Sequence, residues 1–259
     1  MTRRRFEPLY STAVAIGRSI FAVLRVKGSA TGLENLPQTG GAVFAMTHFG
    51  YLEFALVEWQ TWLRTRRRIR FLITERAFAK PAVRWLLNGM HHIPVDMKGG
   101  AAAFERAVVA VRAGELVGVF PEAGVSASFT VRELKTGAAR LARDGGVPII
   151  PVAVWGGQRL LTKNHRIALR DRFGVRVTFE FGTPIIVDEG SDIHAVTETL
   201  RESLQRMVDT LQKNYPLDGT GQWWQPRSLG GTAPTVEEAA AADAARALRR
   251  EQGASQPGK

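Results

Sequence analysis

Short apolar runs alternate along the chain with longer segments in which apolar residues recur every three to four positions. Continuous apolar runs are typical of strands buried on both faces of a sheet, whereas the 3.6-residue repeat indicates helices. The predicted strands cover residues 42–46, 69–73, 116–120, 149–154 and 175–181. The predicted helices cover residues 51–63, 81–87, 101–112, 131–142 and 193–211. This alternation predicts an α/β fold with a mixed, largely parallel central sheet flanked by helices.

An additional helix is predicted near the N-terminus, within residues 8–26. It carries too many polar positions to span a membrane, which takes about 20 mostly apolar residues. One side is apolar and consists of Leu9, Ala13, Ile16, Ile20, Val23 and Leu24. The helix is interpreted as an interfacial one lying on a membrane surface. A first helix packed on the core has the same periodicity, and the pattern alone does not separate the two.

The C-terminal part differs in composition from the rest. Residues 216–234 are rich in Gly, Pro, Gln and Trp and are interpreted as a wrapping segment or linker. Thr235 and Glu238 then form a capping-box pattern that opens a helix with little apolar bulk. We therefore divide the chain into a membrane-proximal helix (1–30), a catalytic domain (31–215) and a C-terminal wrapping segment with an exposed helix (216–259).

The charge balance indicates an anionic partner. The 259 residues include 35 Lys and Arg against 24 Asp and Glu, a formal net charge of +11. Five arginines fall in the seven positions 64–70, either as a solvated helix end or as a site for an anionic membrane or coenzyme A phosphates. Cysteine is absent, which excludes disulfides, a thiolate nucleophile and a zinc–thiolate site.

A histidine and a carboxylate lie five positions apart after the 42–46 strand. In one continuous helix His48 and Glu53 would stand about 140° apart around the axis, so they meet only if His48 lies in the turn before the helix. Gly50 supplies backbone freedom for that turn. Glu53 would then bind one ring nitrogen and leave the other to accept a proton. By itself this spacing is more common for capping or core histidines than for catalytic ones.

A second carboxylate follows the 116–120 strand. Glu122 comes after Pro121, which holds the preceding residue extended, and before two small residues that let a ligand approach the backbone. Because sites in open α/β sheets gather at the carboxyl ends of strands, Glu122 is expected near His48 as a substrate-binding group. The alternative is a structural carboxylate in the first turn of a helix, near Ser126. Together the two carboxylates and the histidine indicate base-catalysed transfer onto a hydroxyl.

Four sequence blocks carry a resemblance to a known family. They are His48 to Glu53, residues 89–96, Phe120-Pro121-Glu122 with Ser126, and residues 147–152. Their order and spacing resemble the glycerolipid acyltransferase superfamily of the PlsC type, which carries His-x4-Asp, a Gly-Ile-Pro-Val-Asp-Arg-like block, Phe-Pro-Glu-Gly-Thr-Arg-Ser and Val-Pro-Ile-Val-Pro-Val. The lead-in at residues 32–37 and the Lys-x-Gly-Ala helix entry at 135–138 also match. The resemblance covers about residues 25 to 185.

The resemblance implies that His48 is the catalytic base and Glu53 its orienting partner, with Glu in place of the usual Asp. Met97 and Val125 stand where the family has Arg, and Gly124 where it has Thr. The lost groups usually help to bind the acceptor phosphate. The residues then expected to contact substrate are Glu122, Ala123, Gly124 and Ser126, with Arg76, Lys98, Arg132 and Lys135 as basic substitutes.

The implied reaction moves a fatty acyl group from acyl-CoA or acyl carrier protein to a lysophospholipid hydroxyl, foremost the sn-2 hydroxyl of 1-acylglycerol-3-phosphate. Another lipid or glycolipid hydroxyl is the alternative acceptor. No metal and no cofactor beyond the acyl donor are expected. The protein is expected to bind an anionic membrane surface peripherally, at the cytoplasmic face of the cell membrane.

Three rival functions have specific weaknesses. A basic nucleic-acid-binding protein would need a reading module, and the arginine run lacks interleaved aromatic residues. A hydrolase would need direct activation of water, since the chain has no Gly-x-Ser-x-Gly elbow and no Cys. A catalytically retired membrane module would not need the His48 and Glu53 pair. The adjacent His91 and His92 are assigned to structure rather than to a metal, because neighbouring strand positions face opposite ways.

Overall fold

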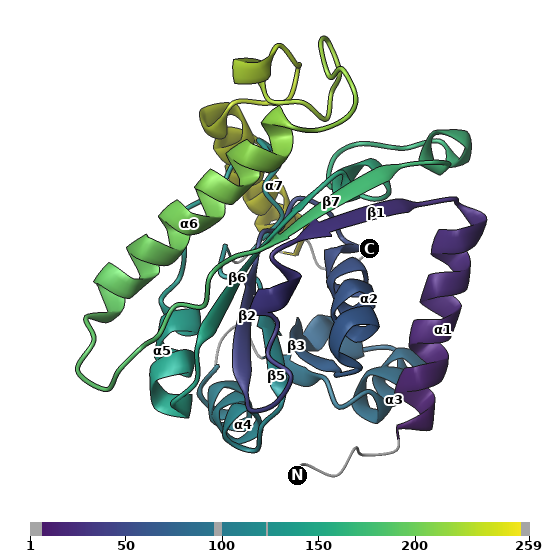
Figure 1. The fold of residues 1–259 in the computed structure, drawn as a ribbon. Coiled ribbons are helices and arrows are strands. Elements are labelled where there is room, and N and C mark those ends of the chain that lie inside the picture. The colour runs from purple at the N-terminus through teal and green to yellow at the C-terminus, as the bar shows by residue number, and fades with distance from the viewer. Residues whose placement is uncertain (1–6, 96–99, 123, 255–259) are drawn as a thin grey trace.

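The computed structural model describes residues 7–95, 100–122 and 124–254, without the side chains of residues 76, 77, 247 and 250–254. Within this part of the chain, seven strands form one sheet (Figure 1). They are β1 (Lys27–Thr31), β2 (Ala42–Met46), β3 (Ile69–Thr74), β4 (Ile93–Val95), β5 (Leu116–Val119), β6 (Ile149–Trp155) and β7 (Arg176–Phe181). Their order across the sheet is β1-β7-β6-β2-β5-β3-β4. Neighbours pair in parallel except β6 with β7, so the predicted mixed, largely parallel sheet is confirmed.

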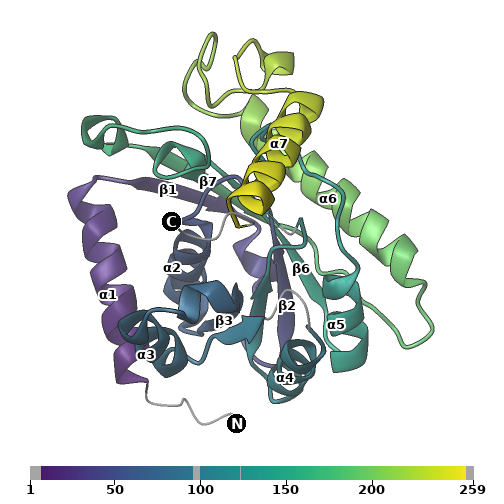
Figure 2. The same cartoon turned by 180° about the vertical axis from the view of Figure 1, so that it is seen from behind.

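Helices cover both faces of this sheet (Figures 1 and 2). The α-helices are α1 (Pro8–Val23), α2 (Glu53–Thr65), α3 (Pro81–Gly89), α4 (Ala101–Arg112), α5 (Gly137–Gly145), α6 (Ile193–Lys213) and α7 (Val236–Ala254). Short 3-10 helices are η1 (Leu33–Asn35), η2 (Glu75–Phe78), η3 (Gly157–Arg159), η4 (Leu169–Arg172) and η5 (Arg227–Leu229). Helices α1, α2 and α3 lie on one face, and α4, α5 and α6 on the other.

The core consists of two apolar layers separated by the sheet. In β2 the alternate residues Val43 and Ala45 face the layer shared with α4, α5 and α6, whereas Phe44 and Met46 face the layer shared with α1 and α2. All five β2 residues are buried. This double burial explains why the central strands have continuous apolar runs rather than an alternating pattern.

Prediction and structure differ at three elements. Strands β1 and β4 were not predicted, because β1 is an exposed, polar edge strand and β4 has only three residues. The helix predicted at 131–142 begins only at Gly137. Before it, the backbone N–H groups of Val131, Arg132 and Lys135 donate to Gln205, Glu122 and Pro121 respectively. These long-range bonds replace the helical ones, and no local periodicity signals them.

Helix α1 is packed on the domain and also has an exposed apolar side. The Tyr10 hydroxyl is buried and donates to the Ile69 carbonyl at 2.7 Å, and Phe21 is buried in the same layer. On the other side Ile16, Ile20 and Val23 are 57%, 53% and 69% exposed. The helix therefore packs on the core, as one interpretation expects, and presents an apolar face, as the other requires. None of the helices in the described residues is long and apolar enough to cross a bilayer.

The arginine run at 64–70 lies at the amino ends of the strands. Arg70 is buried and its guanidinium meets Glu7 and Glu115, with an Nη1 to Oε2 distance of 2.7 Å to Glu7. Arg67 donates to the carbonyl of Pro37 at 2.9 Å. These side chains fasten α1 and β3 to the domain. Arg70 is buried, so the interpretation of this run as a solvated helix end is wrong for that residue.

Two tryptophans of the segment after α6 pack on neighbouring aromatic residues. Trp224 is buried against Tyr215, and Trp223 stacks on His165 with ring centroids 3.7 Å apart. The predicted capping box at the start of α7 is confirmed. The Glu238 carboxylate accepts from the Thr235 N–H, and the Thr235 hydroxyl accepts from the Glu238 N–H.

The domain boundaries at 30/31 and 215/216 stay predictions. Strand β1 begins at Lys27 and pairs with β7, so the sheet includes residues on both sides of the first boundary.

Candidate active site

The loop between β2 and α2 is held against the ends of neighbouring strands. The Thr47 hydroxyl accepts from the Val154 N–H at 3.1 Å, and the Tyr51 N–H donates to the Leu161 carbonyl at 2.9 Å. A β-carbon at Gly50 would lie only 2.9 Å from the Leu161 oxygen. Gly50 does not adopt the left-handed conformation, so the expectation that it supplies turn freedom is wrong. The glycine is needed for close packing of two backbones.

The Glu53 carboxylate accepts hydrogen bonds from the backbone of this loop. Glu53 is the first residue of α2 and is fully buried. Its Oε1 accepts the N–H groups of Phe49 and Gly50 at 2.9 and 3.0 Å. Its Oε2 lies 3.3 Å from His48 Nδ1. The structure therefore brings His48 and Glu53 together as predicted, with the histidine in the turn and the carboxylate in the first helical turn.

The protonation of this pair follows from its burial. Burial lowers the pKa of His48 to about 4, although Glu122 and the Gly50 backbone act in the opposite direction. Burial also raises the pKa of Glu53, against the lowering effect of the Phe49 and Gly50 N–H groups. Because both Glu53 oxygens face N–H donors, we assign the carboxylate form with a neutral imidazole whose Nδ1 proton points to Oε2. The second nitrogen, Nε2, is then free to accept a proton.

The imidazole is also fixed in its plane. The Phe120 ring, directly after β5, stacks on it with centroids 4.0 Å apart and an interplanar angle of 26°. The His48 side chain remains 17% exposed. One ring nitrogen is thus turned to a buried carboxylate while part of the ring stays accessible, which is the arrangement a general base requires.

Glu122 lies beside His48 and contacts it through the backbone. Its side chain is buried, at 3% exposure. Oε1 accepts the His48 N–H at 2.9 Å and Oε2 accepts the Arg132 N–H at 3.1 Å. Burial raises the pKa of Glu122 to about 7, opposed by these two N–H groups. The carboxylate joins two loops, a role not predicted from the sequence, while its predicted contact with substrate remains a prediction.

The segment after Glu122 is irregular rather than helical, which contradicts the alternative of a helix-terminal carboxylate. The buried Ser126 donates its N–H to the His48 carbonyl at 2.8 Å and its hydroxyl to the Thr130 carbonyl at 2.9 Å. Ser126 therefore also fastens the His48 loop. A β-carbon at Gly124 would lie 3.5 Å from Arg132 Nη1, so the Arg132 guanidinium lies beside this position.

The predicted basic residues are distributed unevenly. Arg132 is at the site through its bond to Glu122, whereas the Lys135 side chain is exposed on the outer surface. The Arg76 side chain, Lys98 and Ala123 lie outside the described residues. A basic residue that was not predicted is Lys163, whose neighbour Thr162 donates its hydroxyl to the Phe49 carbonyl at 2.6 Å. No motif marks Lys163, because it reaches the site only through this loop-to-loop contact.

His91 and His92 precede β4 in a turn rather than lying in the strand. His91 adopts a left-handed backbone conformation, with φ of 56°. The buried His92 accepts the Phe71 N–H through Nδ1 at 3.1 Å. Burial lowers the pKa of His92 to about 3, which keeps it neutral. The structural assignment of His92 fits these contacts.

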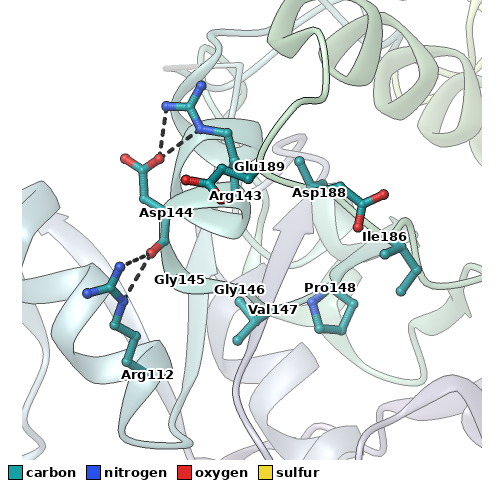
Figure 3. A pocket seen from close by; sticks show the side chains of 11 residues that line it. Arg112, Arg143, Asp144, Gly145, Gly146, Val147, Pro148, Ile186, Asp188 and Glu189 are labelled. Atoms are coloured by element: carbon teal, nitrogen blue, oxygen red, sulfur yellow. Dashed lines mark hydrogen bonds and ion pairs between the residues drawn. The ribbon is translucent and has the colours of Figure 1, made fainter.

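A sizeable hollow lies at the other end of the sheet (Figure 3). Its volume is about 750 Å³, and it lies between the C-terminal ends of α4 and α5 and the segment before α6. Arg112 on its wall donates to the Asp144 carbonyl, and Arg143 binds the Asp144 carboxylate. Ligands of open α/β sheets bind at the carboxyl ends of the strands, and this hollow adjoins the amino ends of β5 and β6. The chemistry is at His48 instead.

Comparison with known sequences agrees with this geometry. The family model described as "Acyltransferase" matches residues 28–155. The 1-acyl-sn-glycerol-3-phosphate acyltransferase of Bacillus subtilis is 30% identical over 139 residues, which are 50% of this chain and 65% of that protein. The chloroplastic 1-acyl-sn-glycerol-3-phosphate acyltransferase BAT2 of Brassica napus is 26% identical over 52% of this chain and 39% of its own length. The chain thus spans less than two thirds of these curated relatives.

The fold has a counterpart among solved structures. The 1-acyl-sn-glycerophosphate acyltransferase PlsC of Thermotoga maritima superposes with a TM-score of 0.65, covering 80% of this chain and 81% of that one at 20% identity. The matched family segment contains His48, Glu53 and Glu122, the residues that the structure gathers at one edge of the sheet. The four ordered blocks, the family match and the shared fold make this chain similar to the glycerolipid acyltransferase superfamily of the PlsC type.

Proposed function

We propose that the protein transfers a fatty acyl group from a thioester donor, acyl-CoA or acyl carrier protein, to a hydroxyl of a glycerophosphate. The acceptor we propose is 1-acylglycerol-3-phosphate, acylated at its sn-2 hydroxyl. The observation that carries the proposal is the buried Glu53 carboxylate facing Nδ1 of His48 at 3.3 Å, beside a strand end that also supplies Glu122. The names of the relatives support the same reaction class.

In the proposed reaction His48 Nε2 takes the proton of the acceptor hydroxyl as its oxygen attacks the thioester carbonyl carbon. The new carbon–oxygen bond forms, the carbon–sulfur bond breaks, and the imidazolium returns its proton to the departing thiolate. Glu53 stabilises the imidazolium that exists between these two transfers. The present 3.3 Å separation is long for a charged hydrogen bond, and such contacts shorten in the substrate complex.

The surface around α1 supports peripheral membrane attachment. The exposed side chains of Ile16, Ile20 and Val23 line an apolar hollow of about 640 Å³ together with Leu169 of η4. Arg172 lines the same hollow, and the Arg18 guanidinium of α1 lies 5.1 Å from the Trp62 ring centre on α2. An apolar face next to arginines suits an anionic bilayer surface, which we propose to be the cytoplasmic face of the cell membrane.

Replacing His48 by Ala should reduce acyl transfer by at least about 100- to 10,000-fold, the usual contribution of a general base. The measurement is thiol release from palmitoyl-CoA with lysophosphatidic acid, and without it to detect hydrolysis. His194→Ala, an exposed histidine on α6, is the matched control and should retain full rate. Turnover of the His48 variant within a few-fold of the parent would exclude the mechanism. Equal use of lysophosphatidic acid and monoacylglycerol would keep acyl transfer and point to a neutral hydroxyl acceptor.

Replacing Glu53 by Gln should lower kcat by about 1,000- to 10,000-fold while changing acceptor KM little, because a wrong tautomer disables the base. The Gln carbonyl can still accept from Phe49 and Gly50, so its NH2 group must face His48 Nδ1. This moves the imidazole proton to Nε2, the atom that should accept one. Glu53→Asp should recover part of the rate. A Gln variant with parental kcat would show that the pairing is not used.

The pH profile of kcat/KM, which reports the free enzyme, should fall on the acid side only well below pH 6.5, the ordinary pKa of histidine. Neutral imidazole is the active form, and burial lowers the pKa of His48 to about 4, so the base stays unprotonated through the mildly acidic range. The measurement is initial rate against pH, with thermal unfolding at each pH to exclude loss of fold. An acid limb at or above pH 6.5 would contradict this environment for the base.

The double change Ile16→Glu and Ile20→Glu should weaken binding to anionic vesicles by at least about tenfold, since each side chain loses its apolar burial. Co-sedimentation with phosphatidylglycerol-rich vesicles gives the bound fraction. Val109→Glu, an equally exposed apolar position on α4, should bind like the parent. Salt should release part of the bound protein. Identical binding of parent and double variant would remove α1 from the proposed membrane surface.

A further inference from the structure

A carboxylate from the C-terminal helix is bound by cations at the catalytic edge. Asp243 of α7 lies 2.5 Å from the Lys163 amino group and 3.8 Å from Arg132 Nη1. The Asp243 and Lys163 side chains are 28% and 20% exposed, so this contact is largely shielded from solvent. Figure 2 shows α7 crossing the end of the sheet from which the β2 and β6 loops emerge. Residues 28–155 carry the family match, so Lys163 and Asp243 both lie outside it.

Both cations belong to loops that hold His48. Arg132 donates its backbone N–H to Glu122, which accepts the His48 N–H on its other oxygen. Lys163 follows Thr162, which bonds the carbonyl of Phe49, the residue after His48. The two positive side chains are therefore carried by segments directly attached to the base.

The Arg132 guanidinium also lies beside the sequence block that contains Phe120, Pro121 and Glu122. Its Nη1 would lie 3.5 Å from a β-carbon at Gly124, the position before Val125. This is an ordinary contact distance, so the Arg132 guanidinium lies directly beside Gly124. Val125 is buried and uncharged. The Arg132 guanidinium thus places a positive charge beside the Phe120-Pro121-Glu122 block, from a position later in the sequence.

We propose that Arg132 and Lys163 bind a substrate phosphate group and that Asp243 holds the same pair as an internal anion when no phosphate is present. This rests on the proposed function. A phosphate with up to two negative charges and three acceptor oxygens can engage an ammonium and a guanidinium together, whereas one carboxylate engages them less strongly. Phosphate displaces Asp243 from Lys163, so α7 competes with the substrate and sets its apparent affinity.

Helix α7 can release Asp243 without losing its other attachments. Its first turn is held by the capping box, and Glu238 also binds Arg227 at 2.8 Å. These contacts lie near the start of α7, away from Asp243. Asp243 also lies 3.9 Å from Arg246 one turn further along α7, an i,i+3 pair that contributes little to the stability of the helix. Removing the Asp243 charge therefore tests mainly competition for the two cations of the phosphate site.

The test is equilibrium binding by calorimetry, which does not depend on turnover. The probes are 1-hexanoylglycerol 3-phosphate, its dephosphorylated form 1-hexanoylglycerol, and coenzyme A. Asp243→Asn should tighten phosphate-ligand binding by about two- to fivefold, the strength of a partly exposed ion pair. Asp171→Asn on η4 removes the same charge from an exposed residue that pairs with the exposed Arg170, and it should leave binding unchanged. Lys163→Gln and Arg132→Gln should each weaken binding by about 10- to 150-fold.

Two comparisons make the outcome specific. Asp243→Asn should give no gain for 1-hexanoylglycerol, and little gain in a Lys163→Gln background. Gains limited to the acylglycerol phosphate assign the pair to the acceptor, and gains limited to coenzyme A assign it to the donor. Equal effects of Asp243→Asn and Asp171→Asn, or unchanged binding in the Lys163 variant, would overturn the proposal. An inactive parent that still shows the binding pattern would refute acyl transfer but not the phosphate site.

Discussion

The position of His48 depends on two buried carboxylates that accept backbone N–H groups. Glu53 takes the N–H groups of Phe49 and Gly50, and Glu122 takes that of His48 itself. A buried carboxylate is costly unless it is hydrogen-bonded, and the loop supplies the donors that make its burial tolerable. The same bonds fix the loop backbone, so the imidazole is aimed before any substrate arrives. The same N–H groups thus stabilise the buried carboxylates and fix the position of the His48 imidazole.

This arrangement also explains why the site is built where β2, β5 and β6 end. These strands are adjacent and parallel, so the loops that follow them emerge at one edge. The base comes from the first loop, the bridging carboxylate from the second, and the Lys163 loop follows β6. Three distant parts of the sequence therefore meet without any long-range motif connecting them. The rigid sheet fixes the spacing, and the loops supply the chemistry.

The sequence predicted the central strands, most helices and the pairing of His48 with Glu53, because apolar periodicity and short spacing are local signals. It did not predict why Gly50 is small, since the Leu161 carbonyl that excludes a side chain comes from a different loop. It placed a helix over residues 131–136, where the N–H groups of Val131 and Arg132 bond to Gln205 and Glu122. It also missed Lys163 and its partner Asp243. In each case the contact that determines the local structure joins residues far apart in sequence. Neither composition nor local periodicity indicates such a contact.

Helix α1 is joined to the domain by buried contacts rather than by a flexible tether. Tyr10 bonds to the backbone of β3, and Glu7 pairs with the buried Arg70. A rigidly held apolar face determines orientation as well as attachment. On a bilayer the domain would take one tilt, and the sheet edge carrying His48 would keep a constant height and angle above the lipid headgroups. As the protein diffuses along the membrane, His48 would then stay at one depth relative to the lipid headgroups. Only acceptor hydroxyls at that depth would come within its reach.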